Sequence, residues 1–120
     1  MRFLSMVRIN ERAGQKPDAK LMEDMGRLMA EMSAAGSLLD TAGLRPTAEG
    51  KRVRLSHGRQ TVVDGPFAET KEVVAGYAML QAASMDEALA LARRFLEVHG
   101  DGWEVECELR QIDEGGCDAE

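Results

Sequence analysis

Two predicted strands carry apolar side chains on both faces, and they constrain the fold more than any other feature of this chain. Residues 2–9 place Phe3 and Val7 on one face and Leu4 on the other, and residues 73–82 are apolar in the same two-sided way. A strand of this kind lies in the middle of a sheet or is covered on both sides. We therefore expect both segments to be central strands of one sheet.

Each of these strands leads towards an amphipathic helix. Between Asp18 and Ala35 the apolar residues recur with the helical period, and Gly36 follows as a stop signal. Asp18 is placed to cap the amino end of this helix. Ser84 and Glu87 have the spacing of a capping box, which predicts the start of a second helix.

Two further strands and a hairpin complete the pattern. Residues 37–45 predict a strand after the first helix. Residues 103–112 predict one after the second, with glutamates on one face only, as expected at a sheet edge. Residues 53–63 predict a hairpin with His57 and Gly58 at its tip. This order indicates an α+β, ferredoxin-like split βαβ fold with a hairpin insertion, an antiparallel sheet and two helices on one face.

The uncovered face of such a sheet predicts an oligomer. If both helices cover one face, apolar residues of the central strands remain on the other, among them Leu4, Met6, Val74, Tyr77 and Met79. An exposed patch of this size is unusual in a monomer. We therefore expect a homodimer, with two sheets packed into a dimeric α/β barrel.

Composition excludes several classes of partner. The net charge of −6 disfavours nucleic acid, and the basic residues of the predicted hairpin are interpreted as a solvated face. No apolar run approaches the roughly 18 residues of a membrane span, and no secretory signal is found. Cys107 and Cys117 do not make a disulfide framework, and no metal site or cofactor is predicted. These features predict a cytoplasmic protein with one domain over residues 1–112 and a disordered acidic tail over 113–120.

Methionines gather on the first predicted helix, which holds four of the eight in the chain. Met22, Met25, Met29 and Met32 share its apolar face. A soft methionine surface suits a ligand, but we interpret this stripe as the face that packs on the sheet.

The densest group of ionisable residues lies in residues 64–72. Asp64 precedes a Gly-Pro turn, so its carboxylate either caps the turn or serves as a general base in a cleft. If the segment is extended, Glu69 and Lys71 face the same side and are candidates to bind a polar ligand or each other. Tyr77 and Arg54 are further candidates for ligand binding, with core packing as the alternative for Tyr77.

A family resemblance rests on these same residues. The run DGPFAETKE at 64–72, followed by Gly76 and Tyr77, resembles the signature of the DGPF-type branch of the YCII-related proteins. The resemblance spans roughly residues 2–112 and implies the dimeric α/β-barrel form of the ferredoxin-like fold. Some members of the wider group resemble enzymes with a His–Asp pair whose His lies on the first helix. This chain has Met25 at that place, so the pair is not carried over.

Three functions remain open at this point. The first is a homodimeric small-ligand-binding or regulatory module. The second is a cofactor-independent enzyme on a small organic substrate, with Asp64 as acid or base. The third is an accessory protein of an alternative sigma factor, because the resemblance implies that some relatives are encoded beside such factors.

Overall fold

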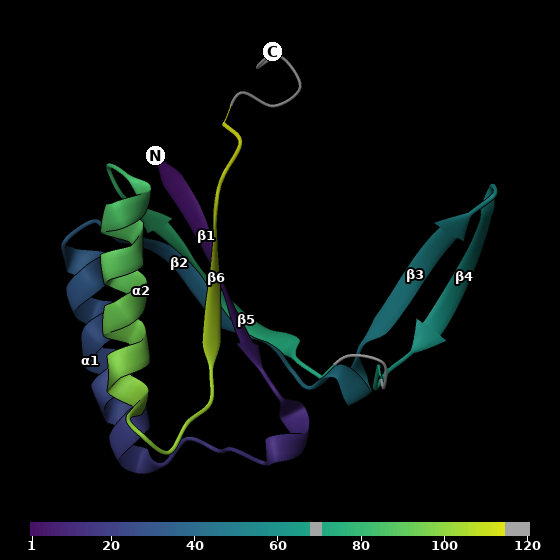
Figure 1. Ribbon diagram of the computed structural model, residues 1–120, viewed down its shortest axis with the longest axis horizontal. Coiled ribbons are helices and arrows are strands. Elements are labelled where there is room, and N and C mark those ends of the chain that lie inside the picture. The colour runs from purple at the N-terminus through teal and green to yellow at the C-terminus, as the bar shows by residue number, and fades with distance from the viewer. Residues whose placement is uncertain (68–70, 115–120) are drawn as a thin grey trace.

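The computed structural model describes residues 1–67 and 71–114, which form a sheet, a layer of helices and a projecting hairpin (Figure 1). Two short 3-10 turns, η1 (Glu11–Ala13) and η2 (Thr47–Glu49), lie at the foot of the hairpin. The regular elements are β1 (Arg2–Ile9), α1 (Ala19–Ala34), β2 (Leu38–Gly43), β3 (Lys51–Ser56), β4 (Arg59–Asp64), β5 (Val73–Gln81), α2 (Met85–His99) and β6 (Glu106–Gln111).

The main sheet has the strand order β2-β5-β1-β6, and all of its pairs are antiparallel. The two strands with two-sided apolarity, β1 and β5, lie side by side in its centre, as predicted. In the part of the chain that the structure describes, strands β3 and β4 pair only with each other and form a separate two-stranded sheet. This arrangement confirms the ferredoxin-like α+β fold with a hairpin inserted between its two βαβ units.

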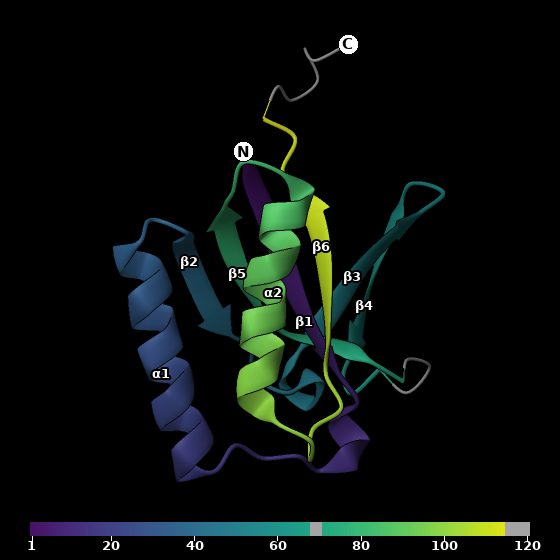
Figure 2. The same ribbon diagram turned by 60° about the vertical axis from the view of Figure 1, so that its left-hand side comes forward.

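Both helices cover the same side of the main sheet (Figure 2). Helix α1 begins where the Asp18 carboxylate accepts a hydrogen bond from the Leu21 amide at 2.8 Å. Helix α2 begins where the Ser84 hydroxyl accepts one from the Glu87 amide at 3.2 Å. Each cap satisfies an amide that has no partner within its helix, so the predicted helix starts are confirmed.

The core lies between the helices and the sheet. Phe3 is its largest fully buried side chain, at 1% exposed, and it packs with Met32 and Leu80. Cross-strand pairing places Phe3 opposite Leu80 on this face and Leu4 opposite Met79 on the other. One set of apolar residues of β1 therefore packs in the core, and the other set lies on the opposite face of the sheet.

Two predictions about these elements are wrong in detail. The last strand begins at Glu106 rather than at Trp103. Trp103 lies in the preceding connection. Its ring packs edge-on against the ring of His99, with the two ring centroids 5.3 Å apart. Met22 was expected on the buried stripe of α1 but is 64% exposed.

The face of the sheet opposite the helices carries an apolar band with an ionic fringe. Register places Leu4, Met6, Tyr77 and Met79 together on this face, and each is partly buried. We call these four residues the open face. At its fringe, Arg8 pairs with Glu108 at 3.1 Å.

The start of the predicted acidic tail is tied to the body of the protein. The Arg2 guanidinium pairs with the Glu114 carboxylate at 2.7 Å, and this contact raises the pKa of Arg2 and lowers that of Glu114. Residues 115–120 of that tail lie outside the described residues.

Candidate functional site

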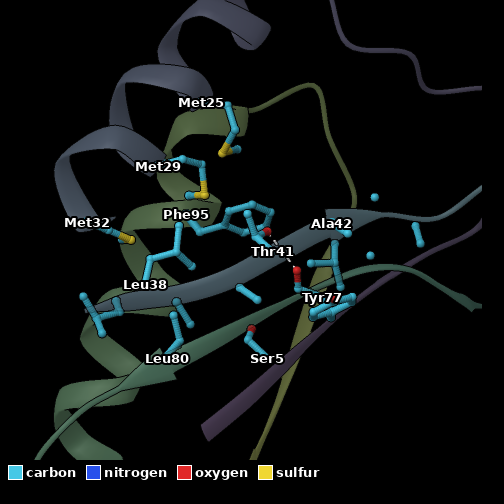
Figure 3. A pocket seen from close by; sticks show the side chains of 17 residues that line it. Ser5, Met25, Met29, Met32, Leu38, Thr41, Ala42, Tyr77, Leu80 and Phe95 are labelled. Carbon is cyan, nitrogen blue, oxygen red and sulfur yellow. Dashed lines mark hydrogen bonds between the residues drawn. The ribbon is translucent and has the colours of Figure 1, made fainter. Parts of the chain in front are cut away.

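An apolar pocket of about 220 Å³ lies between the two helices and the main sheet. Its helical wall is formed by Met25, Met29 and Phe95, whose side chains point towards β2 and β5 (Figure 3). Leu38 and Leu80 form part of its floor. The pocket exists because Met25 and Met29 pack only at the margin of the core and leave space above the strands.

Polar groups at this pocket are few and already hydrogen-bonded. The Thr41 hydroxyl donates to the Tyr77 carbonyl oxygen at 2.9 Å, as Figure 3 shows. Ser5 is 4% exposed, and its side chain is hydrogen-bonded to the thiol of Cys107. Burial raises the pKa of that thiol, and the Ser5 hydrogen bond opposes the shift. A thiol in this state is a poor nucleophile, because the thiolate is the reactive form.

No charged side chain lines the pocket within residues 1–67 and 71–114. Seventeen residues line the pocket, and none of them is Asp, Glu, Lys, Arg or His. Tyr77 is the one titratable residue among them, but its side chain lies on the opposite face of the sheet, where a hydrogen bond to Asp40 raises the pKa of the phenol. This lining suits a neutral, apolar molecule and offers no group for proton transfer near neutral pH.

A more polar cleft lies at Lys71, which belongs to the signature segment of residues 64–72. Lys71 borders two adjoining pockets of about 260 and 500 Å³. Arg8 and Asn10 contribute to the larger one, together with Glu72 and Glu104. The mixed charges of this cleft do not select one class of ligand as clearly as the apolar pocket does.

The signature segment itself closes the foot of the hairpin. The Gly65 amide donates to the Gly50 carbonyl oxygen at 2.9 Å, and the Gly65–Pro66 peptide is cis. The Phe67 ring lies under the Arg52 guanidinium, 3.9 Å from its centroid. Much of the specific chemistry in residues 64–67 therefore holds the hairpin on the body.

The general-base candidate, Asp64, ends strand β4 at this foot. Its side chain is 74% exposed and pairs with Lys51 across the hairpin, at 2.6 Å. It lines none of the pockets described above. Its assignment as acid or base stays a prediction, and the ion pair gives it a structural partner.

The other predicted site residues are dispersed. Arg54 lies exposed on the hairpin, Lys71 borders the polar cleft, and Glu69 lies outside the described residues. Tyr77 borders the apolar pocket through its backbone carbonyl, and its hydroxyl donates to Asp40 at 3.1 Å on the neighbouring strand. No pocket described here is lined by two of these residues, so they do not form one site.

The pocket-lining methionines were interpreted from the sequence as packing residues. That interpretation holds for Met32, which is 2% exposed in the core. It misses that Met25 and Met29 also line a cavity. The signal was present, since four methionines on one helix are unusual and their flexible thioethers adapt to a ligand.

Membrane-spanning helices and clusters of metal ligands are both absent from the part of the chain that the structure describes. Neither α1 nor α2 is long and apolar enough to cross a membrane. Within residues 1–67 and 71–114, no three His, Cys, Asp or Glu side chains cluster as metal ligands.

Comparison with known proteins gives two matches. The profile of the YCII-related domain matches residues 1–106. An uncharacterised protein, R00369, from Rhizobium meliloti (strain 1021) is 40% identical over 79 residues. These residues cover 66% of this chain and 64% of that relative, so the match spans slightly less than two thirds of the relative's length.

Proposed function

The chain belongs to the YCII-related family, and on that premise we propose that it is a homodimer that binds a small, neutral, largely apolar molecule. The ligand occupies the pocket between the helices and the sheet. The observation that carries this proposal is the uncharged wall of that pocket, with its methionine and phenylalanine side chains.

The pocket's size limits the ligand. A dry apolar cavity of about 150 Å³ is large enough for benzene, and drug-sized ligands need about 300 Å³ or more. The volume of about 220 Å³ lies between these values. A substituted single ring or a small bicyclic molecule fits this range.

Binding is favoured over catalysis by the same lining. Proton transfer needs a side chain whose pKa lies near the operating pH and which reaches the substrate. Among the described residues that line the pocket, Tyr77 alone is titratable, and its phenol lies on the open face beside Asp40, which raises its pKa. Asp64 lies on the hairpin with Lys51 as its partner.

The open face supports the homodimer. Leu4 and Met6 on β1, with Tyr77 and Met79 on β5, form one apolar band that neither helix covers. Burying apolar surface contributes about 25 cal/mol per Å². A second copy that packs its own open face on this band would bury both at once, as symmetric interfaces do.

A binding experiment with indole as the probe tests the ligand site. We expect saturable binding by calorimetry and a higher melting temperature. A Met29→Trp variant fills the pocket and should weaken indole binding at least tenfold. Met22→Trp makes the same change on an exposed position of the same helix and should leave binding unchanged.

Two results would contradict the proposed ligand site. One is the absence of saturable binding by indole and by smaller probes such as benzene. The other is equal indole affinity in the wild type and in Met29→Trp, with the variant shown by circular dichroism to be folded.

A further inference from the structure

The hairpin of β3 and β4, residues 51–64, projects from the body as an arm. Of its twelve strand residues eleven are exposed, and Arg52 alone is partly buried. Figure 1 shows the helices on one side of the main sheet and the arm on the other. The arm therefore extends from the side on which the open face lies.

The foot of the arm is built firmly. A Cβ atom on Gly65 would stand 1.7 Å from the Thr47 carbonyl oxygen, so the backbones touch without space between them. The Glu11 carboxylate accepts hydrogen bonds from the Thr47 amide and hydroxyl, at 2.8 and 2.5 Å. These contacts fix where the arm leaves the body, as expected of a segment that must present a defined surface.

One face of the arm is apolar and exposed. Val53 pairs with Val62, and Leu55, two residues further along β3, lies on the same face. Their exposures are 68%, 62% and 69%. A two-stranded hairpin alone is only marginally stable in water, and exposed apolar strand faces favour association. A surface that covers these three side chains would stabilise the arm.

The net charges of the arm and of the body favour a second copy of the chain as the partner. The arm holds four of the 15 Lys and Arg residues and one of the 21 Asp and Glu residues, so its net charge is +3. The remaining 106 residues therefore carry −9. Arg54 and Arg59 lie on the face opposite Val53, and neither forms an ion pair within the described residues. A basic arm on an acidic body complements a second copy of the same chain.

We propose that the arm clasps the partner subunit of the homodimer. Val53, Leu55 and Val62 pack on the partner's body, and Arg54 and Arg59, on the outer face of the arm, add to the positive charge that the partner's acidic body attracts. This inference rests on the homodimer of the proposed function and adds the arm to the interface of the open face.

Sedimentation velocity over a concentration series tests the arm. The triple variant Val53→Thr, Leu55→Thr, Val62→Thr keeps side chains that favour strands but puts a hydroxyl group on each, so that the face becomes more polar. We expect its dimer dissociation constant to rise at least tenfold. Arg54→Glu with Arg59→Glu should weaken the dimer similarly, and added salt should weaken the wild type. Met22→Thr is the control, because it changes an equally exposed apolar residue outside the arm.

The possible outcomes distinguish a failure of the arm proposal from a failure of the homodimer or of the ligand site. If both arm variants dimerise like the wild type, the arm proposal is wrong and the homodimer stands. If the wild type is monomeric at every concentration, the arm proposal and the homodimer both fail, while indole binding still tests the pocket. Binding of duplex DNA to a monomer through Arg54 and Arg59 would also overturn the arm proposal.

Discussion

Gly65 and Thr47 approach so closely that a Cβ atom at position 65 would stand 1.7 Å from the Thr47 carbonyl oxygen. The contact joins the end of the arm to the η2 turn, and the Gly65 amide adds a hydrogen bond to Gly50. The first half of the signature is thus explained by chain packing. Only glycine allows two backbone segments to meet at this distance.

Replacing Gly65 with alanine should therefore destabilise the protein. The added methyl group meets backbone atoms, which cannot rotate away, and overpacking of this kind costs about 1–3 kcal/mol or more. Urea unfolding measures the change. Gly102→Ala is the control, because a Cβ there meets nothing within 4 Å. Equal stability of Gly65→Ala and the wild type would contradict the packing described here.

Replacing Gly26 with alanine should have the opposite effect. Gly26 lies exposed within α1, and a Cβ there would meet nothing within 4 Å. Alanine in a helix interior is favoured over glycine by about 0.5–1 kcal/mol. The melting temperature should rise. A fall would show that the helix surface at Gly26 is in contact with something else, such as another subunit.

Glu11 should make the foot of the arm sensitive to acid. The hydrogen bonds from the Thr47 hydroxyl and amide lower the pKa of Glu11 below its ordinary value of 4.5. A carboxyl group with a lowered pKa stabilises the fold above its unfolded pKa and loses that contribution as the pH falls through its folded pKa. We expect stability to fall below about pH 4.5.

The variant Glu11→Gln isolates this contribution. Its loss of stability relative to the wild type should be full at pH 6–7 and should shrink towards pH 3. Asp24 and Glu114, whose pKa values are also lowered by ion pairs, keep some acid sensitivity in the variant. A difference between wild type and variant that does not change with pH would exclude the role of the Glu11 charge.

Asp64→Asn should change stability very little. The Asp64–Lys51 ion pair is exposed on both sides, and such pairs contribute about 0–1 kcal/mol. Urea unfolding should place the variant within this range. If Asp64→Asn instead abolished a turnover measured in the wild type, without loss of fold, the acid–base assignment of Asp64 would be supported over the binding proposal.

The sequence predicts the framework well because its signals are local. Two-sided apolarity marks β1 and β5 as central, and Asp18 and Ser84 cap the helices as their spacing predicts. The projection of the arm has no such local signal. Alternation in residues 53–63 is the same whether a hairpin packs on its own body or extends from it.

The apolar pocket is also invisible to periodicity. The helical period shows that Met25 and Met29 face inwards, and they do. Whether they fill the space above β2 depends on the sizes of side chains from α2 and the sheet, such as Phe95 and Leu38. Those residues are distant in the chain. The same limit applies to Asp64, whose partner Lys51 is set by strand register.

Methyl-labelled methionine NMR tests the central claim, a ligand site under the helices, most directly, because methionines lie in the pocket, on the open face and on the exposed surface of the helices. Met25, Met29 and Met32 line the pocket, Met6 and Met79 lie on the open face, and Met22 and Met85 are exposed. Titration with indole should shift the methyl signals of the three pocket methionines and leave Met22 and Met85 in place. Shifts confined to Met22, Met85 or the open face, or no saturable shift at all, would contradict a ligand site under the helices.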